Sequence, residues 1–378
     1  MATRSKSPAE NRGPTIRDVA KAAGVSTATV SNVLRGTRFV GPDLQKRVHE
    51  AINSLSYTPN QVAASLRERR TRIIGVAVPD ITTGLFTEIV RRIEKRAACT
   101  DYQIILADSE ENVMAERARI GALIKRKIDG LIVIPCHDDS PVLEDLRRSK
   151  IPTVLVDRAA EGAVFDSVMA DNCLGAREGT RHLLSLGHRH IMLLASEAGL
   201  RNIQERIQGY REALREAGFS DLENIVVAGA NKADIVKPAL EQLLRKESRP
   251  SAMFAVTQKM TVGALQVVAE AGLVIPKDIS FLAFDDCEWF RAMRPFLSTI
   301  SQPAEDFADQ AWSMLMARLN NDRAPTFRKE VHCTLIVRES TIQYQAPPGG
   351  LATEQLGAVN RPAEKAKSSF AKDILKIV

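Results

Sequence analysis

The strongest constraint on this 378-residue chain is an alternation of short apolar runs with longer amphipathic segments over residues 72–340. The run IIGVAVP at 73–79 ends in a turn signal, as a buried strand does. The segment after it places Phe86, Ile89 and Ile93 on one helical face. Strands that alternate with helices of about 10–15 residues predict parallel sheets built from βαβ units. The region is long enough for two such lobes with a ligand cleft between them.

The same alternation predicts further strands and helices along the region. Each predicted strand is a short apolar run, and each predicted helix repeats its apolar residues at steps of three and four. The further strands are Gln103–Ala107, Gly130–Pro135, Thr153–Val156, Val168–Ala170, His190–Ala195, Asn224–Val227, Ala252–Val256 and Ile279–Phe284. The further helices are Val113–Lys125, Pro141–Arg148, Cys173–Leu186, Arg206–Ala217, Ala233–Arg245, Met260–Ala271 and Ala304–Asn320.

A second pattern lies near the N-terminus, where residues 15–34, TIRDVAKAAGVSTATVSNVL, predict two short helices joined by a tight turn. Gly24 suits the left-handed backbone that closes a helix, and Ser26 stands where an N-cap residue would start the second helix. An apolar stripe at 44–55 predicts a third helix. The first two helices and their turn make a helix-turn-helix, whose second helix enters the DNA major groove. An ordinary helical hairpin in a small bundle fits the local pattern too.

Positive charge is concentrated in the segment that carries this pattern. Residues 1–72 hold 13 lysines and arginines against 5 acidic residues, a net charge of +8, so the remainder carries −2 of the total of +6. Neutralising DNA phosphates requires such a basic patch. The charge therefore favours a DNA-binding segment over a plain helical bundle.

Several classes of protein are disfavoured by what the sequence lacks. The five cysteines are far apart and form no CxxC or Cys/His cluster, which fits a reducing cytoplasm and neither a disulfide framework nor a zinc site. We find no apolar run of the roughly 20 residues that a membrane helix needs, no signal peptide, no P-loop and no GxGxxG or GxSxG motif. We expect no enzyme, no cofactor, no metal and no membrane partner, and we assign His182, His188 and His190 a structural role.

These observations divide the chain into five segments. Residues 1–13 are polar and are predicted to be disordered, and residues 14–58 form the helix-turn-helix domain. Residues 59–71 are a linker with too few apolar positions to pack a long helix, so we expect helix there only when something holds it. A plain solvated linker is the alternative. Residues 72–340 form the two-lobed α/β core, and residues 341–378 form a flexible tail.

Nine stretches of the sequence are specific when their order and spacing are taken together. They are IRDVAKAAGVSTATVSNVLRG, SYTPNQVAASLR, IIGVAVPDITTGLFTEIVRRIE, IDGLIVIP, IPTVLVDR, HLLSLGHRHI, RIQGYREAL, IPKDISFLAFDD and LSTISQP. In these the chain resembles the LacI/GalR family of bacterial transcription regulators across residues 14–340. The resemblance implies a DNA-binding domain, a hinge helix and a periplasmic-binding-protein-like core that binds a small effector. It further implies a repressor that binds a near-palindromic operator in double-stranded DNA as a homodimer, or possibly as a tetramer.

The resemblance assigns roles to residues of the DNA-binding domain. In the family, the first residues of the second helix and one residue a turn later face base edges, which here are Thr27, Ala28 and Asn32. Ala28 offers a methyl contact, and Asn32 can make the paired contact to adenine. Ser26 and Thr29 are expected to hold phosphates, which set register rather than sequence. A purely structural role for Thr29 is the alternative.

The resemblance also gives the linker a function. In the family, a leucine of the hinge helix wedges into the minor groove and kinks the DNA, and Leu66 occupies that position. Ala63 is small enough to let two hinge helices of a dimer approach each other. Asn60 would start each hinge helix, and Arg67 would lie near phosphates.

The effector cleft retains part of the family pattern. By resemblance, Arg206 and Asp285 are expected to grip the ligand, and Phe86, Asp157 and Asp171 are further candidates. Each has a simpler alternative, because Phe86 would fit a core and Asp157 and Asp171 follow strands and would fit helix caps.

Two stretches of the cleft depart from the family pattern. Relatives often carry Asn-Asp where this chain has Thr257, Gln258 and Lys259, and Asn-Pro where it has Thr83-Gly84. One anion is lost and one cation is gained, so Lys259 and Arg206 together would favour an anionic effector such as a sugar acid over a neutral carbohydrate. The alternatives are a cleft that has drifted and no longer responds, or a solute-binding module.

Overall fold

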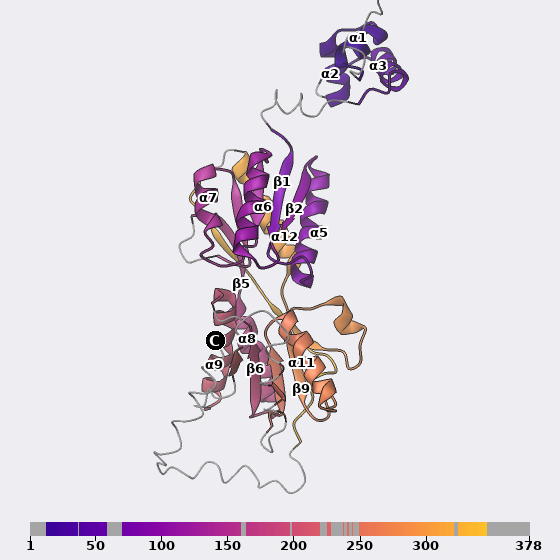
Figure 1. The fold of residues 1–378 in the computed structure, drawn as a ribbon. Helices are drawn as coiled ribbons and strands as arrows, with labels where there is room; N and C mark the ends of the chain where they lie inside the picture. The colour runs from indigo at the N-terminus through magenta and orange to yellow at the C-terminus, as the bar shows by residue number, and fades with distance from the viewer. Residues whose placement is uncertain are drawn as a thin grey trace, which may run out of the picture. The chain divides into compact units, whose positions relative to one another are not determined.

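The computed structural model describes residues 13–36, 38–58, 70–159, 164–196, 199–219, 225–227, 249–320 and 324–345, with single residues 237, 240, 241 and 244. The chain divides into two compact units, Met1–Thr71 and Arg72–Val378, and each is described by itself (Figure 1). The segment predicted to be a disordered N-terminus, most of the predicted linker, most of the predicted helix at 233–245 and most of the predicted tail lie outside the described residues.

The N-terminal unit contains three helices, α1 (Ile16–Ala23), α2 (Thr27–Arg35) and α3 (Pro42–Ser54). Each helix contributes one fully buried valine, Val19, Val30 and Val48, to the same small hydrophobic core. Because these valines recur with the helical period, burying them fixes which face of each helix remains outside.

The turn between α1 and α2 has the geometry that the sequence predicted. Gly24 has φ +64°, and its N–H donates to the carbonyls of Ala20 and Lys21. The Arg47 guanidinium, from α3, donates to the Ala23 carbonyl oxygen at 2.6 Å and so holds the turn. The positive φ of Gly24 favours glycine, and a Cβ there would lie 2.5 Å from Arg47 Nη2 and would displace this guanidinium from the turn.

The first lobe of the core is a six-stranded parallel sheet in the order β11-β5-β4-β3-β1-β2. Ile74 and Val76 of β1 belong to the cluster formed with α5 and α12, whereas Ala77 belongs to the cluster formed with α6 and α7. Helices therefore cover both faces of the sheet (Figure 1). Its elements are β1 (Ile73–Val78), α5 (Gly84–Cys99), β2 (Gln103–Asp108), α6 (Val113–Lys125), β3 (Gly130–Val133), α7 (Val142–Ser149), β4 (Thr153–Val156), β5 (Asp166–Ala170), α12 (Ala304–Leu319) and β11 (Arg328–Val331).

The second lobe is a six-stranded sheet in the order β12-β10-β9-β8-β6-β7, parallel except for the β12 edge. Its elements are α8 (Asn172–Ser185), β6 (Ile191–Ala195), α9 (Arg201–Glu216), β7 (Ile225–Val227), β8 (Ala252–Ala255), α11 (Gln258–Glu270), β9 (Ser280–Phe284), the 3₁₀ turn η1 (Glu288–Arg291), β10 (Ser298–Ser301) and β12 (Thr334–Ile336).

Helices α8 and α9 pack unusually closely in the second lobe. A Cβ placed on Gly209 of α9 would lie 2.0 Å from the carbonyl oxygen of Cys173 and 2.9 Å from the backbone nitrogen of Arg177, both on α8. The two backbones can approach this closely only because residue 209 has no side chain.

The chain passes between the lobes three times, at β5 to α8, at β10 to α12 and at β11 to β12. Asp171 lies at the first crossing. Its backbone N–H donates to Val331 at 3.0 Å, and its carboxylate accepts from the Cys333 N–H at 2.7 Å and contacts His332 Nδ1 at 2.7 Å. The first and third crossings are therefore bonded to each other.

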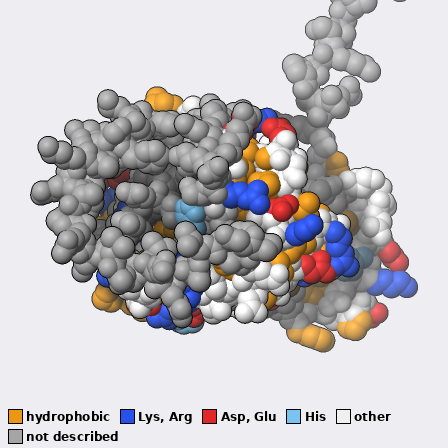
Figure 2. Space-filling view, turned by 90° about the horizontal axis from the view of Figure 1, so that it is seen from below, with side chains coloured by type: hydrophobic (Ala, Val, Ile, Leu, Met, Phe, Trp, Pro, Cys, Tyr) orange, Lys and Arg blue, Asp and Glu red, His pale blue; other side chains and the backbone are white. Residues whose placement is uncertain are grey.

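The predicted α/β alternation is confirmed, and the differences have local causes. Helix α9 begins at Arg201, five residues before the predicted start. The prediction missed its first turn because that turn is mostly polar. Three strands were not predicted: β10 (Ser298–Ser301), whose sequence STIS is mostly polar, β11 (Arg328–Val331), whose sequence RKEV is charged and mostly exposed, and β12 (Thr334–Ile336), which is short and lies at a sheet edge. On the face seen in Figure 2, acidic and basic side chains of the described residues are interspersed, as the low net charge outside residues 1–72 suggests.

Candidate DNA-binding helix and effector cleft

Helix α2 presents short polar side chains away from its buried stripe. Thr27 and Ala28 are exposed in its first turn, and Asn32 is half-buried one turn later. Ser26 caps the helix, as the sequence predicted, by accepting from the Thr29 N–H at 3.1 Å, and its hydroxyl lies 2.9 Å from that of Thr29. The structure therefore brings the five predicted DNA-contacting residues of this helix together on its first two turns. Asn60, Ala63, Leu66 and Arg67, predicted for the hinge, lie outside the described residues.

Replacing Ser26 by alanine is expected to destabilise the start of α2 by about 1 kcal/mol, because the Thr29 N–H loses its acceptor. Ser26→Gly should cost only about a few tenths of a kcal/mol, since glycine leaves the Thr29 N–H open to water. Hydrogen exchange of the α2 amides in the full chain measures both. An alanine variant that exchanges as slowly as the wild type would show that the cap contributes nothing.

A small cavity of about 40 Å³ lies between the two lobes of the core. Seven of the eight predicted effector residues line it, and Asp171 does not. The predicted lining residues are Phe86, Asp157, Arg206, Thr257, Gln258, Lys259 and Asp285. The lining residues that sequence reasoning missed are Thr83, Leu85, Glu111, Arg158, Ser196, Leu200, Asn202, Ile203 and Gln302.

Arg206 is held rigidly in this cavity although it is only 2% exposed. Its Nε donates to Asn172 Oδ1 at 2.9 Å, and its Nη1 donates to the Val256 carbonyl oxygen at 2.6 Å. The guanidinium carbon lies 3.8 Å from the centre of the Phe284 ring. A planar cation fixed by two hydrogen bonds and a ring face is well placed to orient a polar ligand.

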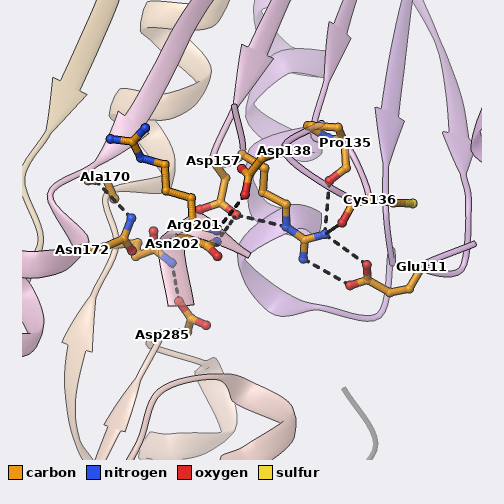
Figure 3. Close-up of polar contacts among 12 residues, drawn as sticks. Glu111, Pro135, Cys136, Asp138, Asp157, Ala170, Asn172, Arg201, Asn202 and Asp285 are labelled. Atoms are coloured by element: carbon orange, nitrogen blue, oxygen red, sulfur yellow. Dashed lines mark hydrogen bonds and ion pairs between the residues drawn. The ribbon is translucent and has the colours of Figure 1, made fainter. Parts of the chain in front are cut away.

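Asp157 and Asp285 each follow a central strand with an unusual backbone conformation. Their φ values are +62° and +75°, in the left-handed region that costs a residue other than glycine free energy. This backbone conformation directs both carboxylates into the cavity. There Asp157 accepts from Asn202 Nδ2 at 3.1 Å (Figure 3). Asp285 accepts from Gln302 Nε2 at 2.6 Å. Burial raises the pKa of Asp157 above its usual value.

Four buried polar atoms of the lining have no hydrogen-bond partner among the residues that the structure describes. Three are acceptors, Asp157 Oδ1, Asn202 Oδ1 and Gln302 Oε1, and one is a donor, Arg158 Nε. Buried polar groups are nearly always satisfied, so such a set indicates a place where water or a ligand completes the bonding. A ligand suited to it supplies mainly hydrogen-bond donors.

The missed residues Arg158, Asn202 and Gln302 carried weak signals in the sequence. Arg158 directly follows the predicted Asp157, and its guanidinium is fixed by the Glu111 carboxylate at 3.1 Å and by the Cys136 carbonyl oxygen at 2.8 Å. Gln302 lies in LSTISQP at the second crossing between the lobes, and Asn202 lies in the polar first turn of α9. Only the folded crossings bring these three side chains to one cavity.

The structure does not bring Asp171 to the cavity with the other predicted effector residues. Both of its carboxylate oxygens are bonded to the third crossing, one to the Cys333 N–H and one to His332, and it is absent from the cavity lining. Asp171 stands at the N-cap position of α8, but its side chain does not cap the helix. Its role is to join two crossings.

Lys259 lines the cavity as predicted, but its charge has a partner in the first lobe. Lys259 Nζ lies 2.7 Å from Asp80 Oδ2 of the first lobe, so its charge is balanced within the chain. Thr257 caps α11 by accepting from the Met260 N–H at 3.2 Å.

A helix-turn-helix unit and a two-lobed α/β core with a polar cavity between its lobes define the class of DNA-binding regulators. Residues 15–60 match the family described as bacterial regulatory proteins, lacI family, and residues 180–341 match the periplasmic binding protein-like domain. None of the helices among the described residues is long and apolar enough to cross a membrane.

Similar proteins extend along most of the chain. The HTH-type transcriptional repressor PurR of Photorhabdus laumondii is 34% identical over 87% of this chain and 97% of its own length, and PurR of Edwardsiella ictaluri is 34% identical over 86% and 96%. Among solved structures, the lac repressor dimer bound to operator and the anti-inducer ONPF has a TM-score of 0.77 at 25% identity, over 88% of this chain and all of that one. The CelR–cellobiose complex has a TM-score of 0.65 at 28% identity, over 87% and 100%. The chain belongs to the lacI family of bacterial regulatory proteins, and it is a DNA-binding transcriptional repressor rather than an enzyme.

Proposed function

We propose that this repressor binds a near-palindromic operator as a homodimer in the bacterial cytoplasm, and that a small effector in the cleft between the lobes controls its operator affinity. The observation that carries the effector half is the set of four unpartnered polar atoms around the 40 Å³ cavity. The lac repressor structure, a dimer on its operator, supports the DNA half. A tetramer is the alternative assembly.

The effector is a neutral, donor-rich molecule such as a carbohydrate. Three of the four unpartnered atoms accept hydrogen bonds, which hydroxyl groups can supply. The carboxylates of Asp157 and Asp285 line the same cavity as Arg206, whereas Lys259 is neutralised by Asp80, so the cavity offers an anion no surplus of positive charge. Related structures contain cellobiose or ribose, which are neutral sugars. This balance makes a sugar acid the weaker candidate.

Control of DNA binding then follows from coupling between two sites. A ligand that binds one arrangement of the lobes more tightly than another shifts the population toward it, and the operator reports that shift. We further propose that Thr27, Ala28 and Asn32 contact base edges and that Ser26 and Thr29 contact phosphates. In the hinge, Leu66 would wedge into the minor groove, Asn60 would start the helix, Ala63 would allow two helices to approach, and Arg67 would lie near phosphates.

Selection of bound sites from random duplex DNA tests this function and is expected to return a palindrome with a flexible central step. With that operator in hand, Asn32→Ala should reduce affinity about 10- to 100-fold and relax the preference at one position of each half-site, because a paired contact to one base is lost. Asn53→Ala changes the same residue type at an exposed position of α3 and serves as the control.

Two outcomes would contradict the proposal. Failure to enrich any symmetric site would reject operator binding. An equal loss of affinity for all DNA sequences in Asn32→Ala would show a phosphate contact in place of base recognition. A protein that binds the operator but responds to no ligand would have the drifted cleft that the sequence left open.

A further inference from the structure

The two stretches that depart from the family pattern contact each other across the mouth of the cleft. Gly84 is the first residue of α5 in the first lobe, and Gln258 is the first residue of α11 in the second lobe. Gln258 Oε1 accepts from the Gly84 N–H at 2.8 Å. The first N–H groups of a helix have no partner within it, so a side-chain acceptor from the facing lobe satisfies one of them.

Residue 84 must be small for this contact. A Cβ on Gly84 would lie 3.3 Å from Gln258 Oε1 and 3.3 Å from Cys287 Sγ, both in the second lobe. These distances are shorter than ordinary van der Waals contact. A side chain at position 84 would therefore require Gln258 and Cys287 to give way by a few tenths of an ångström.

A second bond lies beside the first. Lys259 Nζ is 2.7 Å from Asp80 Oδ2, and the other carboxylate oxygen of Asp80 accepts from the backbone N–H and the hydroxyl of Thr82. Burial raises the pKa of Asp80, but hydrogen bonds from Lys259 and Thr82 outweigh it and leave that pKa below its usual value. The carboxylate is thus charged and oriented toward the second lobe.

The size of the cavity shows what these bonds do. A space of 40 Å³ holds only about three water molecules. A second cavity of about 460 Å³ lies next to it and shares Leu85, Asp285 and Gln302 with its lining. Gln258 lines the small cavity and Gly84 lines the large one, so their hydrogen bond stands at the boundary. The larger space already has the size of an ordinary ligand pocket, roughly 300–1,000 Å³, and opening the boundary would join to it the small cavity with its unpartnered polar atoms.

We propose that Asp80, Gly84, Gln258 and Lys259 form a cleft latch, and that this latch must open before the effector can occupy the cavity. The inference rests on the proposed function in one respect, that the cleft binds an effector. The latch sets the fraction of molecules that can bind, and the apparent dissociation constant of any effector is its intrinsic value divided by that fraction. Gln258 and Lys259 therefore tune the response through closure of the lobes, in addition to any contact with the ligand.

Hydrogen exchange over residues 80–87 of the full chain tests the latch without any ligand. Asp80→Asn and Lys259→Met should each raise the exchange rate of this segment about tenfold, and the reversed pair Asp80→Lys/Lys259→Asp should restore most of the protection. Gln258→Leu should expose the Gly84 amide, whereas Gln258→Glu, which keeps an acceptor, should not. Lys237→Met, which breaks the exposed ion pair with Glu270 inside the second lobe, is the matched control and should leave the segment unchanged.

Operator affinity gives the second readout. Opening the latch changes the arrangement of the lobes, so Lys259→Met should change the operator dissociation constant at least threefold while Lys237→Met does not. Unchanged exchange in the single variants, or a reversed pair that exchanges as fast as either single variant, overturns the latch while the repressor function stands. If the wild type bound no operator while the variants still lost protection of residues 80–87, the proposed function would be rejected and the latch would stand.

Discussion

Gly209→Ala is expected to destabilise the core by about 3 kcal/mol or more, although it adds one methyl group. The added Cβ would lie 2.0 Å from the Cys173 carbonyl oxygen, and no rotamer change relieves a contact between two backbones. Helices α8 and α9 would have to separate, which would expose apolar side chains such as Ala176 and Ala213, both now buried.

Urea unfolding of the full chain measures this loss, and Gly121→Ala is the matched control. Gly121 lies within α6, and a Cβ there meets no atom within 4 Å. The control should gain about 0.5–1 kcal/mol, because alanine loses less conformational freedom in a helix than glycine. If both variants unfolded at the same urea concentration, the result would contradict the close packing of α8 on α9 at Gly209.

Arg206→Met is expected to cost about 2–5 kcal/mol in stability and to abolish the effector response. The substitution leaves Asn172 Oδ1 and the Val256 carbonyl oxygen without their donor, and each buried orphan costs about 1–3 kcal/mol. Arg206→Lys should recover only part of the loss, since a single ammonium cannot reproduce the planar fork. Arg211→Met, an exposed arginine on the same helix, is the control and should behave as wild type.

Calorimetric titration with neutral sugars and their matched sugar acids supplies the functional readout. The wild type should bind a neutral member and Arg206→Met should bind none. Selective binding of the acids by the wild type would contradict the neutral effector. Retention of sugar binding by Arg206→Met would remove this arginine from the ligand site.

Much of the fold could be predicted because its signal is local. Most buried strands of the two sheets are short apolar runs, and the covering helices repeat apolar residues with their own period. Strands β10, β11 and β12 were missed, because a polar, charged or very short strand carries no such signal. The cap at Ser26 and the turn at Gly24 were predictable for the same reason, since both depend on neighbours within a few residues.

The cleft was harder, because its chemistry depends on partners far away in sequence. Asp171 follows a strand as a ligand-binding aspartate would, but its carboxylate bonds to Cys333 and His332 instead. Lys259 had the charge of an anion-binding residue, yet Asp80, on the other lobe, neutralises it. The composition of a site can be read along the chain, but the pairing of its charges is decided by the fold.

The bond between the first and third crossings has a mechanical consequence. Short connections that lie together resist translation of one body past another, while they leave rotation about a line through them comparatively easy. Asp171 ties two of the three connections into one unit, which stiffens sliding further. We therefore expect rotation about the crossings to be the softest motion of the lobes, so that opening and closing cost less free energy than sliding.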